Sequence, residues 1–216
     1  MVDTASRPQG IETDTWIPAT WEAFVTLSNR PGFDKARGYY DKGWMRLEMA
    51  ALGPWHGRDN AVVLKVIGLF AGLTNIRAVE LINTSFHKSG EREAQPDIAF
   101  YLGESFQLLP RTNQPVDVEV YGAPQLAVEI ASTTLGDDLG RKRLLYERLG
   151  VQEYWVVNVA MSEVVTFAVE NGGSREIRES QVLPGLALST VEEAMQRSQT
   201  EDDGALTRWL IQTFQG

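Results

Sequence analysis

Residues 125–131 read QLAVEIA, and this stretch decides the fold that the sequence predicts. In an extended strand, alternation places Leu126, Val128 and Ile130 on one face and puts Glu129 between two alanines on the other. A carboxylate in such an apolar strand is costly to bury without a cation, a metal ion or a raised pKa. Glu129 is therefore a candidate site residue. A structural ion pair or a solvated strand face is the alternative interpretation.

Other short strands and several helices surround this segment. Alternating or apolar runs predict strands at residues 37–40, 44–49, 78–82, 85–88, 97–101, 154–157, 164–169 and 175–181. Periodicity and capping signals predict helices behind Thr20, from 59 to 74, from 138 to 149 with Gly150 at its end, behind Thr190 and Glu193 as a capping box, and from 205 to 214. This order predicts a mixed α/β (α+β) fold with a central sheet flanked by helices.

Length and composition favour one domain. The chain has 216 residues, of which 43% are hydrophobic and 23% charged, the balance of an ordinary globular protein. We expect a flexible N-terminal arm at 1–18 and a single domain at 19–216 with a C-terminal helical extension. The absence of cysteine excludes disulfides, thiolate metal sites and cysteine nucleophiles. Without a signal peptide or a membrane-length apolar run, the sequence predicts a cytoplasmic protein with no membrane partner.

The overall charge argues against general attraction to nucleic acid. The formal net charge is -9 and the isoelectric point is about 4.8, so a phosphate backbone is repelled on average. Arg141, Lys142, Arg143 and Arg148 nevertheless fall within one short segment. This segment predicts either a local positive face or an ordinary solvated helix face.

A second carboxylate occupies a position similar to that of Glu129. Asp97 lies in QPDIAF at 95–100, at the start of another apolar strand. If the two strands are neighbours, both acids converge, and paired carboxylates are ligands that suit Mg²⁺ or Mn²⁺. The alternative is that Asp97 is a turn residue after Pro96.

Lys142 is the candidate cationic partner of these acids. On a helix it shares one face with Leu145, Tyr146 and Leu149, and Asp138 lies one turn earlier. An ammonium group aimed at the acids could stabilise the charge that develops in a phosphoryl-transfer transition state. The alternatives are a lysine whose stem packs on the sheet while its ammonium reaches water, or a helical pair with Asp138.

These features together resemble a known family. Asp97 in its Pro-Asp step, Glu129, the GAP segment at 122–124, Lys142 and GVQEYWVV at 150–157 resemble the Uma-type family of restriction-endonuclease-like proteins. That family is similar to the PD-(D/E)XK nuclease superfamily, and the resemblance spans roughly residues 20–170.

The resemblance implies a restriction-endonuclease-like fold and a metal site. It implies that Asp97, Glu129 and the backbone carbonyl of Ile130 bind Mg²⁺ or Mn²⁺, and that the substrate is DNA. The lysine of the superfamily usually lies two residues after the glutamate, where this chain has Ala131. The resemblance therefore implies that Lys142 takes its place.

Two further residues are candidates for a helper role near the metal. Relatives have an acidic or histidine helper in this region, so His56 or Glu48 could hold a water or orient the ion; an ordinary loop residue is the alternative for His56. His87 has no partner that the sequence identifies. For Glu80 we expect a structural role.

The function that the sequence predicts is metal-dependent endonuclease cleavage of DNA. The alternative is a non-catalytic dimeric binding module with the same fold, which the acidic isoelectric point favours. A homodimer is expected because Trp209, Leu210 and Phe214 offer a large apolar face near the C-terminus. Packing of this face on its own domain is the alternative.

Overall fold

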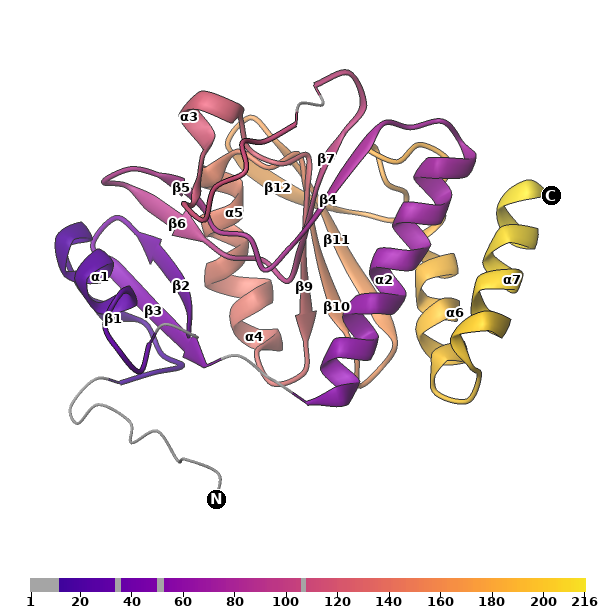
Figure 1. The fold of residues 1–216 in the computed structure, drawn as a ribbon, viewed down its shortest axis with the longest axis horizontal. Coiled ribbons are helices and arrows are strands. Elements are labelled where there is room, and N and C mark those ends of the chain that lie inside the picture. Colours follow the sequence, from indigo (N-terminus) through magenta and orange to yellow (C-terminus); the bar gives the residue numbers. More distant parts are fainter. Residues whose placement is uncertain (1–11, 34–35, 50–52, 106–107) are drawn as a thin grey trace.

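The centre of the molecule is a six-stranded sheet with the order β12-β11-β10-β9-β7-β4 (Figure 1). The computed structural model describes residues 12–33, 36–49, 53–105 and 108–216. The strands are β4 (Ala78–Ile82), β7 (Ile98–Leu102), β9 (Leu126–Ala131), β10 (Glu153–Asn158), β11 (Glu163–Glu170) and β12 (Gly173–Ile177). Only the β9–β10 pair is parallel, while the other pairs of this sheet are antiparallel. The predicted mixed central sheet is confirmed.

A second six-stranded sheet has the order β1-β3-β2-β6-β5-β8. Its strands are β1 (Ile17–Pro18), β2 (Ala36–Asp41), β3 (Trp44–Met49), β5 (Phe86–Lys88), β6 (Arg92–Ala94) and β8 (Val116–Asp117). The predicted hairpin at Lys42 and Gly43 forms β2 and β3. The strand predicted at 85–88 is present as β5. Strands β1, β6 and β8 span two or three residues each, which is too short for an alternation signal, so the sequence did not predict them or their assembly into a second sheet.

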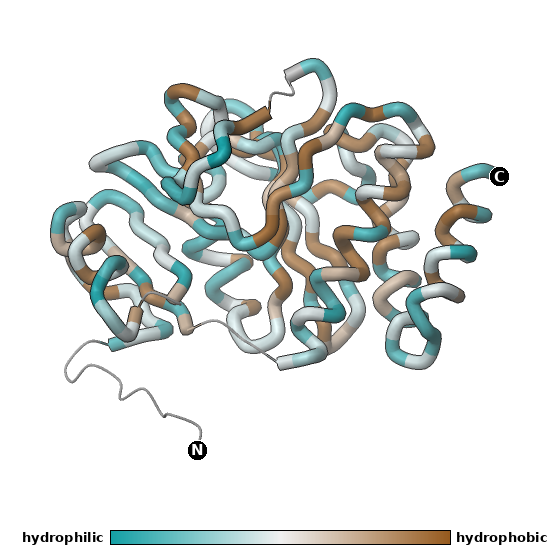
Figure 2. The backbone as a smooth tube through the Cα atoms, viewed as in Figure 1, coloured by the Kyte–Doolittle hydropathy of each residue, from teal (hydrophilic) through white to brown (hydrophobic). Residues whose placement is uncertain are grey.

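Three helices cover one face of the central sheet. They are α2 (Pro54–Leu73), α6 (Leu188–Ser198) and α7 (Asp203–Gln215), and Figure 1 shows them side by side. Their apolar side chains pack on Leu126, Val128 and Ile130 of β9 and on residues of the neighbouring strands. Figure 2 shows brown, hydrophobic segments along the central strands and α2, where this core lies.

The opposite face of the central sheet is covered by a composite helix. It consists of α4 (Leu135–Asp137), a π-helical turn (Asp138–Lys142) and α5 (Arg143–Leu149). Gly150 ends it in a left-handed conformation with φ 97°, as predicted from its position after the last apolar residue. The described residues also form α1 (Trp21–Ser28), which Thr20 caps as predicted, α3 (Val118–Tyr121) and a 3-10 helix at Gly103–Ser105.

Some predicted boundaries were wrong. Helix α2 begins at Pro54 rather than near residue 59, because proline is favourable at the first helical position, where no N–H is needed. Helix α6 begins at Leu188, whose side chain packs into the core, so Thr190 lies inside the helix and caps nothing. Strand β12 ends at Ile177, short of the predicted residue 181.

The apolar face of α7 packs against its own chain. Leu210 is buried, the ring of Phe214 lies 5.3 Å from that of Phe70 in α2, and Arg197 of α6 lies over Trp209. The alternative, in which this face packs on its own domain, is therefore the one that the structure shows. The face no longer supports a homodimer. None of the helices in the described ranges has the length and hydropathy of a membrane span.

The expected N-terminal arm lies partly outside the described residues, which begin at residue 12. Its last residues are hydrogen-bonded to the domain. The backbone N–H of Asp14 donates to the carbonyl of Leu47 at 2.9 Å, and the indole of Trp16 donates to Asp137 at 2.7 Å.

Candidate active site

Asp97 and Glu129 come from adjacent strands at the same end of the central sheet. Ile98 of β7 pairs with Val128 of β9, so the residue before Ile98 and the residue after Val128 lie next to each other. The backbone N–H of Ile130 donates to Oδ2 of Asp97 at 2.7 Å. The prediction that the two strands are neighbours is confirmed.

The second oxygen of Asp97 contacts two basic side chains. Arg37 of β2 forms an ion pair with Oδ1, and Nε2 of His56, in the first turn of α2, lies 3.1 Å from the same atom. Burial opposes ionisation of Asp97, but the hydrogen bond from His56 and the charge of Arg37 hold its pKa below the usual range. Asp97 is therefore ionised at neutral pH and already has a cation as its partner.

Glu129 lies deeper and is held by hydroxyl groups. Its Oε1 accepts hydrogen bonds from Tyr146 at 2.7 Å and from Tyr39 at 3.2 Å, and Nζ of Lys142 lies 3.8 Å away. Burial raises the pKa of Glu129 well above its ordinary value, and the neighbouring Asp138 raises it further against the effect of Lys142. The site thus pairs an ionised carboxylate with one that favours its proton.

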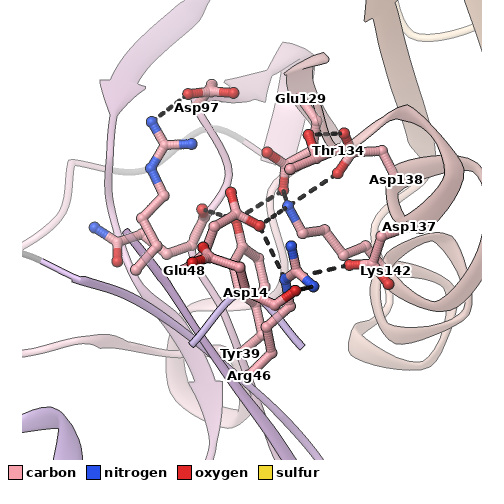
Figure 3. Close-up of polar contacts among 12 residues, drawn as sticks. Asp14, Tyr39, Arg46, Glu48, Asp97, Glu129, Thr134, Asp137, Asp138 and Lys142 are labelled. Carbon is pink, nitrogen blue, oxygen red and sulfur yellow. Dashed lines mark hydrogen bonds and ion pairs between the residues drawn. The ribbon is translucent and has the colours of Figure 1, made fainter. Parts of the chain in front are cut away.

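Lys142 is buried among acidic side chains (Figure 3). Its Nζ lies 2.9 Å from Oε2 of Glu48 and 2.9 Å from Oδ1 of Asp138, and 4.3 Å from the centre of the Tyr39 ring. Burial disfavours the ammonium form, but the surrounding acids outweigh this and raise the pKa of Lys142 well above its ordinary value. The alternative in which the ammonium reaches water is wrong, whereas the predicted pairing with Asp138 is present.

A cavity of about 300 Å³ opens beside these residues. It is lined by Asp14, Arg37, Arg46, Glu48, Met49, His56, Asp97, Glu129, Ile130, Ser132, Thr133 and Thr134. Both sheets contribute to its wall. The structure therefore brings Asp97, Glu129, His56 and Glu48 to one cavity. Lys142 is not in this wall and contacts the site through Glu129 and Glu48.

The oxygen atoms of this wall are suited to a hard divalent cation. Asp97 and Glu129 offer carboxylates, and the backbone of Ile130 directs its carbonyl to the β7 side. This direction follows because the carbonyl of Ala131 accepts from Val159 next to β10, and successive residues of a strand alternate. Such oxygen donors are those that Mg²⁺ and Mn²⁺ prefer.

Within the described ranges, no group of three or more His, Cys, Asp or Glu side chains is arranged to hold a metal ion. Asp97 is instead paired with Arg37, and Glu129 accepts hydrogen bonds from two tyrosines. The oxygen donors present are of the kind that Mg²⁺ or Mn²⁺ binds. In the structure, however, the carboxylate of Asp97 is paired with Arg37.

Sequence reasoning identified Glu48 of the hairpin as a candidate but missed the other hairpin residues of the site. Arg37 and Tyr39 of β2 share one face of the sheet with Arg46 and Glu48 of β3, as their register shows. All four side chains are buried. The signal was available on β3, where Arg46 and Glu48 alternate with apolar residues, but alternation alone does not distinguish a solvated face from a buried polar one.

Two other sequence candidates lie away from the cavity. Nδ1 of His87 is 3.9 Å from Oε2 of Glu93 within the second sheet. Glu80 packs against Gly68 of α2, and burial raises its pKa.

The fold and the paired acids at one end of the sheet define a nuclease-like α+β protein. A family model for Uma2, described as "Putative restriction endonuclease", matches residues 21–205. The chain belongs to this family, which confirms the resemblance that the sequence motifs indicated.

A solved structure has a similar fold. It is the crystal structure of a putative nuclease belonging to DUF820 from Anabaena variabilis ATCC 29413, with a TM-score of 0.53 and 15% sequence identity. The match covers 82% of this chain and 99% of that chain. At this identity the likeness concerns the fold alone. No curated protein matches the chain.

Proposed function

We propose that this protein is a divalent-metal-dependent endonuclease of the PD-(D/E)XK type that hydrolyses phosphodiester bonds in DNA. The observation that carries the proposal is the meeting of Asp97 and Glu129, from adjacent strands, in the wall of one cavity. Membership of a family described as restriction-endonuclease-like supports it.

In this proposal Asp97, Glu129 and the backbone carbonyl of Ile130 hold Mg²⁺ or Mn²⁺. A bound ion of this kind lowers the pKa of water and polarises a phosphoryl oxygen. The protein supplies the orientation of these ligands. His56 and the N–H of Ile130 fix the two oxygens of Asp97, while Tyr39 and Tyr146 fix Glu129.

Lys142 takes a positioning role in this scheme. The sequence suggested direct stabilisation of the transition state, but the ammonium is buried against Glu48 and Asp138 and does not line the cavity. It lies behind Glu129, where its charge favours the ionised carboxylate that a metal ligand must be. Glu48 in turn holds Lys142.

A non-catalytic binding module is the alternative function. The ion pair between Arg37 and Asp97 favours it, because the acid already has a protein cation as its partner. The net charge of -9 also disfavours strong binding to DNA. Dimerisation is a separate proposal in either scheme. It is supported by the argument that two symmetric copies would suit the two strands of a duplex.

A plasmid-nicking assay tests the proposed activity. Supercoiled DNA is incubated with wild type, Asp97→Asn and Asp203→Asn, each with Mg²⁺, with Mn²⁺ and with a chelator. Asp203 is an exposed aspartate on α7 that does not line the cavity, and it serves as the matched control. We expect wild type and Asp203→Asn to nick the plasmid with metal only, and Asp97→Asn to lose about 100-fold or more of this activity. DNA retention in a gel shift without any nicking would favour the binding module instead.

A further inference from the structure

Arg37 occupies a special position in the cavity. It lies on β2 of the second sheet and reaches across to Asp97 at the edge of the central sheet. Its Nη2 contacts Oδ1 of Asp97, the oxygen that does not accept from the N–H of Ile130. Nε2 of His56 lies 3.1 Å from the same oxygen, so the guanidinium and the imidazole together cover the oxygen of Asp97 that remains for a ligand in the cavity.

Arg37 and a metal ion cannot share this oxygen in the present arrangement. A divalent cation binds carboxylate oxygen at about 2.0–2.6 Å, within the space that Nη2 takes. The two cations would also repel each other strongly in a buried site, where charges are poorly screened. Binding of a metal at Asp97 thus requires Arg37 to move.

The structure offers Arg37 a second partner. Its Nη2 also donates to Oδ1 of Asn83 at 3.0 Å. Asn83 follows β4 with a left-handed backbone, φ 50°, and its N–H donates to the carbonyl of Asp97 at 3.1 Å. The backbone of Asn83 is therefore held next to Asp97, and its side-chain oxygen can keep Arg37 in the cavity wall after the ion pair opens.

We propose that Arg37 is an internal counter-ion that takes the metal position on Asp97 and moves off it when a divalent cation binds, which frees its guanidinium to contact the phosphate of the substrate. This inference rests on the proposed function. A guanidinium suits the second task because its fork of donors matches two phosphate oxygens. In the structure the charge of Asp97 is thus neutralised by a side chain of the protein itself.

Binding of Mn²⁺ alone tests the inference without any cleavage assay. The loss of the free-Mn²⁺ signal in electron paramagnetic resonance is measured for wild type, Arg37→Gln, Arg46→Gln and Asp97→Asn. Arg46 is the matched control, because it lines the same cavity and is 7% exposed, as Arg37 is, but pairs with Glu48 and Asp137. We expect Arg37→Gln to bind Mn²⁺ about tenfold to a hundredfold more tightly than wild type, since one charge-assisted hydrogen bond no longer has to break.

The control separates displacement from a general charge effect. Arg46→Gln removes the same charge but frees no oxygen of Asp97, so any gain in its Mn²⁺ affinity should be clearly smaller than that of Arg37→Gln. An equal gain in both variants, or an unchanged or weaker affinity of Arg37→Gln, would overturn the inference while leaving a metal site at Asp97 intact. If wild type shows no Mn²⁺ binding, or if Asp97→Asn binds Mn²⁺ as wild type does, the proposed metal-dependent function is overturned. The inference is then overturned with it.

A measurement on the wild type covers the case in which Arg37→Gln does not fold. The Nε–Hε resonance of Arg37, assigned with Arg37→Lys, is followed by nuclear magnetic resonance during a Mg²⁺ titration. We expect it to shift and to saturate together with metal binding, while the corresponding resonance of Arg46 shifts less. An Arg37 resonance that stays in place while Mg²⁺ binds would show that the ion pair persists and that the inference is wrong.

Discussion

The hydroxyl of Tyr146 donates to Oε1 of Glu129 at 2.7 Å, and both side chains are buried. This bond joins α5 to the centre of β9. Because neither group has water to replace its partner, the bond links the position of the helix to that of the carboxyl group. The same helix carries the Arg148 side chain that pairs with Asp41 of the hairpin. The hairpin and the central sheet are thus joined through α5 as well as at the cavity.

Removal of the Tyr146 hydroxyl should cost more stability than removal of a similar but less buried one. We expect Tyr146→Phe to lower the free energy of unfolding by about 1–3 kcal/mol, since Glu129 loses a donor in a buried site. Tyr101→Phe is the matched control, because its hydroxyl donates at 2.8 Å to the carbonyl of Gly122 in a partly buried setting. Urea denaturation of both variants checks the order, and an equal loss would contradict it.

Replacement of Lys142 by an apolar residue should destabilise the fold. Lys142→Met leaves Glu48 and Asp138 without the cation that both contact. Breaking a buried ion pair from one side typically costs about 3–5 kcal/mol. Combining it with Glu48→Gln should cost less than the sum of the two single changes, because one uncompensated charge is then absent. Strict additivity in denaturant unfolding would show that Glu48 and Lys142 do not interact.

Glu93 should make the stability depend on pH between about 4.5 and 7. Burial raises the pKa of Glu93 from 4.5 to about 7. The folded state therefore holds the proton more tightly than the unfolded chain, so the wild type gains stability as the pH falls from 7 to 4.5. Above pH 7 the ionised side chain costs up to about 3 kcal/mol. Glu93→Gln should be more stable than wild type by up to this amount at pH 8, and the advantage should vanish near pH 4.5.

Thermal unfolding of Glu93→Gln across this pH range measures the effect. Glu91→Gln is a suitable control, because Glu91 lies two residues away and Lys88 lowers its pKa. That variant should show no stabilisation at pH 8. A Glu93→Gln curve parallel to that of wild type would mean that folding does not raise the pKa of Glu93.

The end of α5 should depend on glycine at position 150. Gly150 has φ 97° and closes the helix through its N–H bonds to Tyr146 and Glu147. Gly150→Ala should cost about 1–2 kcal/mol, because a Cβ strains this left-handed backbone. Gly136→Ala is the control, since Gly136 has no positive φ and a Cβ there would meet nothing within 4 Å. Equal melting temperatures of the two variants would contradict this account.

Local patterns of the sequence determined much of the fold. The alternation around Glu129, the hairpin at Lys42 and Gly43 and the capping of α1 by Thr20 all depend on neighbouring residues, and the structure has each of them. Asp97 and Glu129 stood out for the same reason, as carboxylates at apolar strands. Short strands such as β6 and β8, and the start of α6, depend on contacts with distant segments, so local patterns did not predict them.

Only the tertiary structure decided which charges are partners. The sequence by itself determined that Asp97 and Glu129 are carboxylates at apolar strands and that Lys142 lies on the apolar side of a helix, and the structure buries all three. It did not determine that Arg37, 60 positions before Asp97, neutralises this acid, or that Glu48 holds Lys142. The physical reason is that a buried charge pairs with whichever opposite charge the packing of strands and helices brings within a few ångströms, at any separation along the chain.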